Sequence, residues 1–251
     1  KNSDLRMKQY QRCSDKDFCL RMGKNIITAK VSNCLKLMKD YHYSASNPIR
    51  FDSFKELESL EKRLQEAETM ESLRGYEGAA ARWYFRGFAD ALTCGVKFPG
   101  RRFHPSTDPV NALLSFGYSF VAREIQGLIE AMGIDPYIGV YHDITYGRAS
   151  LSLDILEEFR HHLVDRLTLK LFNKRIIETE DFEVLESDGG WYLKRDTLKA
   201  FIKHYEETVN APDQEYQGGK HSYRHIFREQ AALLRHAFLD NIDYIPYKVS
   251  S

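Results

Sequence analysis

The stretch GRASLSLDILEEFRHHLVDRLTLKL, residues 147–171, places apolar side chains at the three- and four-residue spacing of an α-helix. We expect Ser150 or Ser152 to cap this helix at its N-terminus. Its buried side is predicted to be a row of leucines: Leu153, Leu156, Leu163, Leu167 and Leu171. Charged and polar residues fall near one another on a second side: Asp154, Glu157, His161 and Asp165. One helix is therefore expected to contribute both to a core and to an acidic, histidine-containing face.

Similar helical spacing recurs along most of the chain, so the predicted fold is mainly α and contains several helices. The other predicted helices cover residues 3–44, 52–68, 70–93, 109–133, 196–209 and 221–240. Asn47-Pro48 is expected to end the first of these regions. The prediction therefore has two parts, an N-terminal helical arm or linker at residues 1–50 and a helical domain at residues 51–251.

One segment has the alternation of a β-hairpin. FEVLESDGGWYLKR, residues 182–195, alternates around a Ser-Asp-Gly-Gly turn, and it is the only clear β element in the sequence. APDQEYQGG, residues 211–219, is rich in turn-forming residues and is expected to be a linker between the last two helices. We therefore predict a multi-helix domain with one small β-hairpin.

The composition indicates a globular protein of the cytosol. Hydrophobic residues make up 43% of the 251 residues, enough for a core, and no apolar stretch reaches the roughly 20 residues of a membrane span. The opening KNSDLRMKQYQRC is charged and is not a secretory signal, and the four cysteines are expected to be reduced thiols. Lys plus Arg and Asp plus Glu number 36 each, so the net charge gives no indication of nucleic-acid binding.

Glu77 is a candidate functional acid because very small residues follow it. Gly-Ala-Ala-Ala occupies residues 78–81, which leaves room for a second helix, a metal or a substrate backbone to approach the carboxylate. Taken alone, however, a glutamate beside an alanine face is more often exposed to solvent. The sequence around Glu77 is therefore compatible with a functional site, but it does not by itself indicate one.

A histidine and two acids in other segments are further candidates. His142 lies in an apolar segment, where a neutral imidazole is either a metal ligand or a core side chain bonded to the backbone. Asp154 and Glu157 are three residues apart on the predicted helix, so both carboxylates project from one side. Glu158 points about 100° away and is expected to be a solvated surface charge.

Glu77, His142 and Glu157 are more informative together than separately. Two carboxylates and an imidazole form a hard oxygen and nitrogen ligand set that suits Mg²⁺ or Mn²⁺. Such a site favours phosphoryl transfer. A second group that could imitate a zinc site consists of His161, His162 and Asp165. The sequence identifies no further ligand for this group.

Basic residues interleaved with aromatic ones are the candidates for DNA binding, because guanidinium groups bind phosphates and aromatic rings stack on bases. The basic candidates are Arg82, Lys97, Arg101, Arg102 and Arg148, and the aromatic ones are Trp83, Tyr84, Phe98 and Phe103. The segment GGKHSYRHIFR, residues 218–228, has the same mixture. Any of these could equally be an ordinary surface. A nucleophile in a strand-turn-helix elbow and a Gly-rich phosphate loop are both absent.

Four segments together resemble the CRISPR-associated Cas1 family of endonucleases and integrases. They are YEGAAARWYF at 76–85, RRFHPSTDPVNALLSFGYS at 101–119, GIDPYIGVYH at 133–142 and GRASLSLDILEEFRHHLVDR at 147–166. The resemblance implies that Glu77, His142 and Glu157 bind the catalytic metal, Mg²⁺ or Mn²⁺. It also implies that Asp154 is a companion acid that organises the ligands or the substrate.

The resemblance carries expectations about function. It implies spacer acquisition, in which a DNA 3′-hydroxyl attacks a phosphodiester at a CRISPR repeat boundary, and DNA endonuclease activity. The expected partners are prespacer and repeat DNA, Cas2 and a second copy of the chain within a larger complex, in a prokaryotic cytoplasm. The resemblance also leads us to expect that the family's N-terminal β domain is absent from this chain, with a fused reverse transcriptase or nuclease as alternatives in its place. A noncatalytic binding subunit and a nuclease that only cuts DNA are the alternatives.

Overall fold

The segment before Asn47 folds as two helices, α1 (Ser3–Ser14) and α2 (Lys16–Ser44), in the computed structural model, which describes residues 2–44, 51–102 and 105–250. Oδ1 of Asp15 accepts hydrogen bonds from the backbone N–H groups of Asp17 and Phe18, at 2.9 and 3.3 Å. The Asp15 side chain therefore satisfies free donors at the start of α2. The helical prediction for residues 3–44 is confirmed, and the structure has a break at Asp15.

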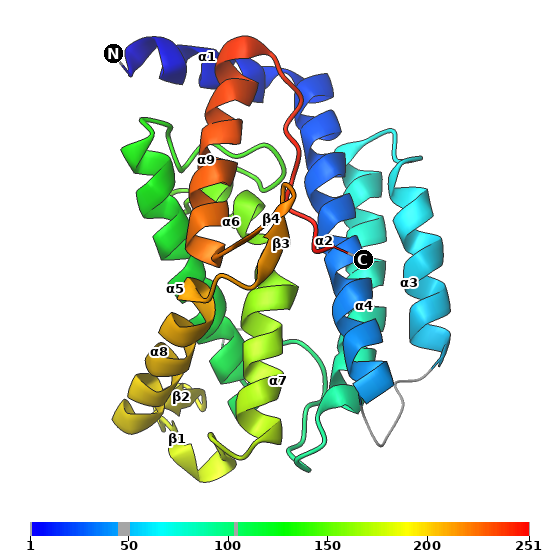
Figure 1. The fold of residues 1–251 in the computed structure, drawn as a ribbon, viewed down its shortest axis with the longest axis vertical. Coiled ribbons are helices and arrows are strands. Elements are labelled where there is room, and N and C mark those ends of the chain that lie inside the picture. Colours follow the sequence, from blue (N-terminus) through cyan, green and yellow to red (C-terminus); the bar gives the residue numbers. More distant parts are fainter. Residues whose placement is uncertain (1, 45–50, 103–104, 251) are drawn as a thin grey trace.

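The helices α3 (Phe51–Leu64) and α4 (Met70–Ala91) pack with each other and with α2 on one side of the molecule (Figure 1). Thr69 caps α4 by accepting a hydrogen bond from the backbone N–H of Ser72. The buried residues of α4 recur at helical spacing and include Leu73, Ala80, Tyr84 and Phe88. This three-helix group forms one wall of the candidate site described below.

The other side of the molecule is organised around α5 (Pro109–Ala131), which contacts α6 (Ser150–Leu156) and α9 (Tyr223–Asp240). The side chain of Asp108 accepts a hydrogen bond from the backbone N–H of Asn111 at 2.8 Å, and Pro109 occupies the first turn. This is the N-terminus that the sequence predicts.

Residues 147–171 do not form one continuous helix, so that prediction is wrong in detail. After α6 the backbone N–H groups of residues 157–159 bond three residues back, and a π-helix follows at Arg160–Asp165 before α7 (Arg166–Asn173). Ser150 and Ser152 do not cap α6; the hydroxyl of Ser150 donates to the carbonyl of Asp143 instead. The π-helix contacts both α2 and α5, so it lies between the two helical groups.

Two antiparallel hairpins are present in the described part of the chain. The predicted one pairs β1 (Phe182–Val184) with β2 (Trp191–Leu193), after a 3₁₀ turn at Thr179–Asp181 and before α8 (Arg195–Asn210). The second pairs β3 (Gln214–Tyr216) with β4 (Gly219–His221), where the sequence predicts a linker. Gln217 and Gly218 both have positive φ, +48° and +80°, which suits a tight hairpin turn. The mainly α class is confirmed.

Beyond α9 the chain runs back toward α2 without regular structure (Figure 1). The backbone N–H of Tyr247 donates to Oε2 of Glu158, and that of Val249 donates to Oδ1 of Asn33 in α2. A single buried cluster extends from Leu5 in α1 to Tyr247 in this segment. The division at residue 50 stays a prediction.

Two expectations drawn from composition agree with the described residues. None of their helices is both long enough and apolar enough to cross a membrane. The four cysteines, which all lie in the described ranges, are free thiols.

Candidate metal centre and the adjoining cavity

The side chain of Lys30, from α2, lies between the carboxylates of Glu77 and Glu157. Its Nζ is 2.5 Å from Oε1 of Glu77 in α4 and 2.7 Å from Oε2 of Glu157, which follows α6. The two acids predicted from separated segments therefore meet at one cation. Because the Lys30 side chain is only 9% exposed, its contacts with the carboxylates are weakly screened by solvent.

Glu157 is buried, yet it is held as a carboxylate. Burial by itself would raise the pKa of Glu157, but the positive charges of Arg160 and Lys30 outweigh it and lower the pKa to about 2. Nη2 of Arg160 lies 3.1 Å from Oε1 of Glu157. Burial opposes the charge of Lys30 as well, but Glu157 and Glu77 together raise its pKa. The centre is therefore an ionised cluster that retains its charge near neutral pH.

The imidazole of His142 faces Glu157 and is fixed from behind by Asp154. Nε2 of His142 is 3.7 Å from Oε1 of Glu157, and Nδ1 is 2.7 Å from Oδ1 of Asp154. Since the carboxylate accepts, Nδ1 carries the hydrogen and Nε2 of the neutral ring carries the lone pair. A carboxylate behind a histidine is the arrangement that commonly orients a metal-binding imidazole.

Asp154 also fixes the backbone of the segment that carries His142. The backbone N–H groups of Val140 and Tyr141 donate to its Oδ2, at 2.7 and 3.1 Å, and that of His142 donates to its Oδ1, at 2.9 Å. A Cβ at Gly139 would lie 2.7 Å from Oδ2 of Asp154, so the close approach of this segment requires glycine. Sequence reasoning missed Gly139, although its position in the Asp-Pro-Tyr segment was a usable signal.

Arg74 in α4 forms hydrogen bonds with the segment that carries His142. Sequence reasoning missed this residue too. Its Nη2 donates to the carbonyl of Tyr141 at 2.8 Å and to Oδ1 of Asp143 at 2.6 Å. Arg74 precedes Glu77 by three residues, so it projects from a similar side of α4. The helix α4 therefore carries Glu77 and, through the hydrogen bonds of Arg74, also helps to position the segment that carries His142.

The predicted ligand set fits a divalent cation in its chemistry, although no three His, Cys, Asp or Glu side chains among the described residues form a ready metal-binding group. The ammonium of Lys30 lies between the carboxylates of Glu77 and Glu157. The charge of the two carboxylates is therefore partly balanced by the Lys30 ammonium in this structure. Glu77, Glu157 and Nε2 of His142 are the donors that would hold Mg²⁺ or Mn²⁺.

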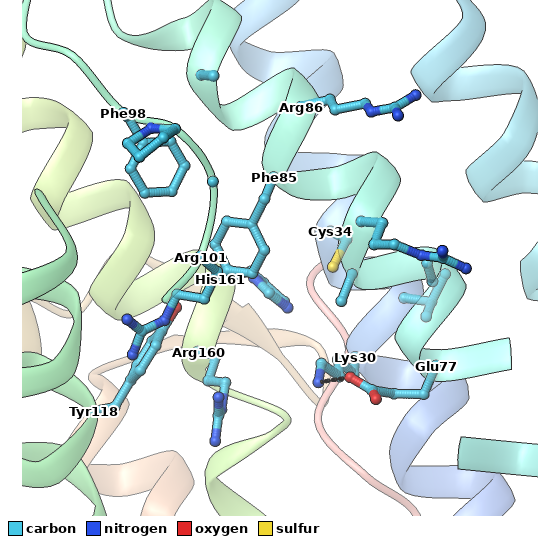
Figure 2. A pocket seen from close by; sticks show the side chains of 17 residues that line it. Lys30, Cys34, Glu77, Phe85, Arg86, Phe98, Arg101, Tyr118, Arg160 and His161 are labelled. Carbon is cyan, nitrogen blue, oxygen red and sulfur yellow. Dashed lines mark hydrogen bonds and ion pairs between the residues drawn. The ribbon is translucent and has the colours of Figure 1, made fainter. Parts of the chain in front are cut away.

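A cavity of about 660 Å³ adjoins this centre, and Lys30, Glu77 and Arg160 line both. Figure 2 shows Phe85 projecting from α4 into the space toward the segment that carries Phe98. Its other walls include small and aromatic side chains, namely Ala80, Ala81 and Tyr118. The small residues after Glu77 thus leave open space beside the carboxylate.

The arginines predicted to bind DNA are divided between two places. Arg82 and Arg101 line the cavity, and Arg82 is exposed at its edge. Arg101 also has a structural role, because its guanidinium donates to Asn111 and to the hydroxyl of Ser115. Arg102 is exposed next to it, whereas Arg148 is exposed in the loop after His142 and does not line the cavity.

The aromatic candidates have different surroundings. Phe98 lines the cavity, Trp83 stacks under the guanidinium of Arg86, and Phe103 lies outside the described residues. Tyr84 is fully buried and donates its hydroxyl to Asp165, so it is not available to stack on a base. In the segment 218–228, the guanidinium of Arg224 is bonded to Glu124 and Glu206.

Glu158 is the clearest error among the sequence predictions. The predicted surface charge is 0% exposed, because the segment after α9 covers it. Tyr244 donates its hydroxyl to Oε1 at 2.5 Å, and the backbone N–H of Tyr247 donates to Oε2 at 2.7 Å. Burial raises the pKa of Glu158 to about 8, even though both donors lower it.

The alternative zinc group does not form. Nδ1 of His161 is bonded to Oδ2 of Asp165 at 2.7 Å, whereas Nδ1 of His162 faces the guanidinium of Arg166 at 3.3 Å. Burial and the neighbouring charge of Arg166 lower the pKa of His162 well below its usual value. The two histidines therefore point to different partners.

This fold and centre define a helical protein in which two acids and a histidine converge beside a cationic cavity. The sequence model of the family described as CRISPR associated protein Cas1 matches residues 1–207. A CRISPR-associated endonuclease Cas1 of Thermus thermophilus is 34% identical over 99% of this chain and 73% of its own length. The chain belongs to the Cas1 family of CRISPR-associated proteins.

Two solved structures share the fold. A casposase bound to integration product has a TM-score of 0.85 at 23% identity, covering 96% of this chain and 67% of that one. A chain of a partial Cas6-RT-Cas1–Cas2 complex has a TM-score of 0.87 at 23% identity, covering 100% of this chain and 74% of that one. At this identity the likeness is one of fold.

Proposed function

We propose that this chain is a CRISPR spacer-acquisition integrase that joins a DNA 3′-hydroxyl to a repeat-boundary phosphodiester at the centre formed by Glu77, His142 and Glu157. The observation that carries the proposal is the convergence of two carboxylates on one buried cation, with Nε2 of His142 3.7 Å from Glu157. Membership of the Cas1 family supports it.

In the proposed reaction the attacking 3′-hydroxyl loses its proton and its oxygen forms a new bond to phosphorus. The bond between phosphorus and the leaving 3′-oxygen breaks, and that oxygen takes up a proton. A bound Mg²⁺ or Mn²⁺ would neutralise charge on the scissile phosphate and polarise the attacking or leaving oxygen. Glu77, Glu157 and His142 would hold this ion. Asp154 keeps His142 in the tautomer whose Nε2 faces the centre.

The cations of the cavity would bind the phosphates of the DNA strand. Arg82 at the edge and Arg101 in the wall line the same cavity as Glu77, so a strand that follows them reaches the acids. Binding through phosphates predicts an affinity that falls steeply with salt. Arg102 and Arg148, both exposed, are proposed to extend the contacted surface.

The proposed partners are prespacer and repeat DNA, Cas2 and a second copy of this chain. One solved relative belongs to a partial Cas6-RT-Cas1–Cas2 complex, which supports Cas2 as a partner and a reverse transcriptase as a fused domain. The name of the casposase structure, bound to integration product, supports strand transfer as the reaction.

A strand-transfer assay tests the proposal. Labelled 3′-hydroxyl DNA and a supercoiled repeat-bearing plasmid are incubated with Mg²⁺ or Mn²⁺, Cas2 and the wild type, Glu77→Ala or Glu157→Ala. Of these three proteins we expect only the wild type to give joined product, and we expect all three to bind DNA similarly. Glu186→Ala, a change at an exposed acid, is the matched control and is expected to join DNA normally.

Analysis of the products separates the integrase from the alternatives. Strand joining that persists in Glu77→Ala contradicts the assignment of the centre. Cut but unjoined DNA identifies a nuclease, since water and a 3′-hydroxyl can attack through the same kind of site. Bound and unchanged DNA with either metal identifies a noncatalytic binding subunit.

A further inference from the structure

The two oxygens of the Glu157 carboxylate have different cationic partners. Nη2 of Arg160 lies 3.1 Å from Oε1, whereas Nζ of Lys30 lies 2.7 Å from Oε2. Arg160 follows Glu157 by three residues, so the two side chains project from a similar side of the chain. They are only 19% and 3% exposed, so solvent screens their contact weakly. One oxygen of a candidate metal ligand is therefore held by a guanidinium from its own segment.

The guanidinium of Arg160 has a second support that the ammonium of Lys30 does not share. It lies over the ring of Tyr118, 4.6 Å from the centroid, and Figure 2 shows the two side chains next to each other. The face of a tyrosine ring attracts a cation. Lys30 instead contacts the two acids that are proposed to bind the metal, Glu77 and Glu157. A divalent ion that binds both acids therefore takes the place of Lys30, whereas Arg160 can stay where it is.

Tyr118 is itself fixed by a buried acid. Its hydroxyl donates to Oδ1 of Asp165 at 2.5 Å, and Tyr118 is only 6% exposed. Asp165 is fully buried and is also bonded to the hydroxyl of Tyr84 and to Nδ1 of His161, each at 2.7 Å. The π-helix thus supplies both the guanidinium of Arg160 and the acid that anchors the ring beneath it.

The number of oxygens that a carboxylate offers affects which divalent ion it binds best. Ca²⁺ takes about six to eight oxygen ligands in flexible geometry and often binds both oxygens of one carboxylate. Mg²⁺ requires a nearly ideal octahedron, and Mn²⁺ also favours an octahedral set. A carboxylate that offers a single oxygen therefore costs Ca²⁺ a ligand that the other two ions do not need.

We propose that Arg160, held by Tyr118, restricts Glu157 to binding a divalent ion through one oxygen and thereby favours Mg²⁺ and Mn²⁺ over Ca²⁺. Arg160 is then a specificity-determining residue, and Tyr118 is a positioning residue that acts through it. The inference rests on the proposed function in taking Glu157 as a metal ligand. It does not depend on DNA or on strand joining.

The ratio of the Mn²⁺ and Ca²⁺ affinities tests the proposal. Isothermal titration of the whole chain with each ion, in the absence of DNA, gives both dissociation constants. Because the two ions carry the same charge, the loss of a nearby positive charge changes both affinities alike and cancels in their ratio. Arg160→Met removes the guanidinium from Oε1, and we expect the ratio to shift toward Ca²⁺ by about tenfold.

Two changes at Tyr118 test its positioning role. Tyr118→Leu removes the ring under the guanidinium and is expected to shift the ratio toward Ca²⁺ by about three- to fivefold. Tyr118→Phe keeps the ring and should stay within about twofold of the wild type. In the Arg160→Met background, Tyr118→Leu should add no further shift, which distinguishes an effect through Arg160 from a general loss of packing. The single changes at Tyr118 decide the question if Arg160→Met does not fold, as thermal melting verifies.

Arg175→Met is the matched control, because it breaks a similar arginine–glutamate pair on the surface. Arg175 lies three residues before Glu178, with Nη1 3.3 Å from Oε1, and its change should leave the ratio as in the wild type.

A wild-type ratio in folded Arg160→Met overturns the inference. So does a Tyr118→Leu shift that persists undiminished in the Arg160→Met background. If the wild type binds neither ion, both this inference and the metal assignment in the proposed function fail. A shifted ratio in Arg160→Met without strand joining by the wild type leaves this inference standing while the proposed function fails. Strand joining by the wild type with an unchanged ratio in Arg160→Met has the opposite meaning.

Discussion

The carboxylate of Asp154 lies 2.7 Å from Nδ1 of His142 and accepts three backbone hydrogen bonds from the segment that carries the histidine. The acid is fully buried and all of its bonds go to this segment. Its negative charge therefore acts on the orientation of His142. The candidate centre consequently depends on an acid that does not face it.

Asp154→Asn is expected to weaken the binding of Mn²⁺ by about 10- to 100-fold, because an amide can no longer accept every one of these bonds and the imidazole loses its fixed tautomer. Isothermal titration with Mn²⁺ measures the change, and thermal melting verifies that the variant is folded. Asp196→Asn, at an exposed acid on α8, is the control. An unchanged Mn²⁺ affinity in Asp154→Asn would show that His142 does not need this support.

Lys30→Met is expected to destabilise the metal-free protein and to increase its stabilisation by Mn²⁺. Removing the ammonium leaves Glu77 and Glu157 without their shared counter-charge, which for a buried pair costs about 3–5 kcal/mol. A divalent ion then no longer competes with the ammonium, and its binding stabilises the folded state more strongly.

Thermal melting in EDTA and in Mn²⁺ checks both parts of the Lys30 prediction. Lys24 on the same helix, a half-buried residue whose Nζ donates to the carbonyl of Gln65, supplies the control Lys24→Met. If Mn²⁺ raises the melting temperature of Lys30→Met no more than that of the wild type, the ammonium does not compete with the metal.

The helices could be predicted from the sequence because their ends carry local signals, such as Asp108 before Pro109. The ligand set came from motifs in separated segments, which the fold then brings together at Glu77 and Glu157. The bridging ammonium of Lys30 could not be predicted, since a lysine in a basic helical segment is usually solvated. Its burial depends on how α2 packs on α4, which no local pattern encodes.

The wrong predictions have a common cause, because contacts with distant parts of the chain decide which side chains are buried. Helical geometry placed Glu158 away from Glu157 correctly, but it could not reveal that Tyr244 and Tyr247, almost 90 positions later, cover that side. Likewise, the hairpin at residues 214–221 has three-residue strands, too short to show alternation. Periodicity identifies a side of a helix, and the rest of the chain decides what covers it.

The stability of the protein is expected to fall as the pH rises toward 8, in part because of Glu158. Its pKa is about 8 in the folded state, against an ordinary value of 4.5, so the folded state binds the proton more tightly. The contribution is therefore fully present below about pH 4.5 and is lost as the pH rises through 8, at up to about 1.4 kcal/mol per pH unit. Glu158→Gln should remove this part of the slope.

Urea unfolding of the wild type and Glu158→Gln between pH 5.5 and 8.5 measures that difference in slope. The exposed acid Glu186 gives the control Glu186→Gln, which should follow the wild type. Parallel curves for the wild type and Glu158→Gln would mean that the buried carboxyl group is ionised throughout this range.

Gly139→Ala is expected to destabilise the protein by about 1–3 kcal/mol and to weaken Mn²⁺ binding. The added Cβ would lie 2.7 Å from Oδ2 of Asp154 and 2.9 Å from Cβ of Ser150, and both neighbours are buried. The segment therefore has to move away from Asp154, which breaks the bonds that fix His142. Gly127→Ala is the matched control, because a Cβ there meets nothing within 4 Å and alanine favours the helix by about 1 kcal/mol. Chemical unfolding and Mn²⁺ titration of both variants test this account. A Gly139→Ala protein with wild-type stability and metal affinity would mean that the segment tolerates displacement and that His142 is positioned by other contacts, with Arg74 as the first alternative.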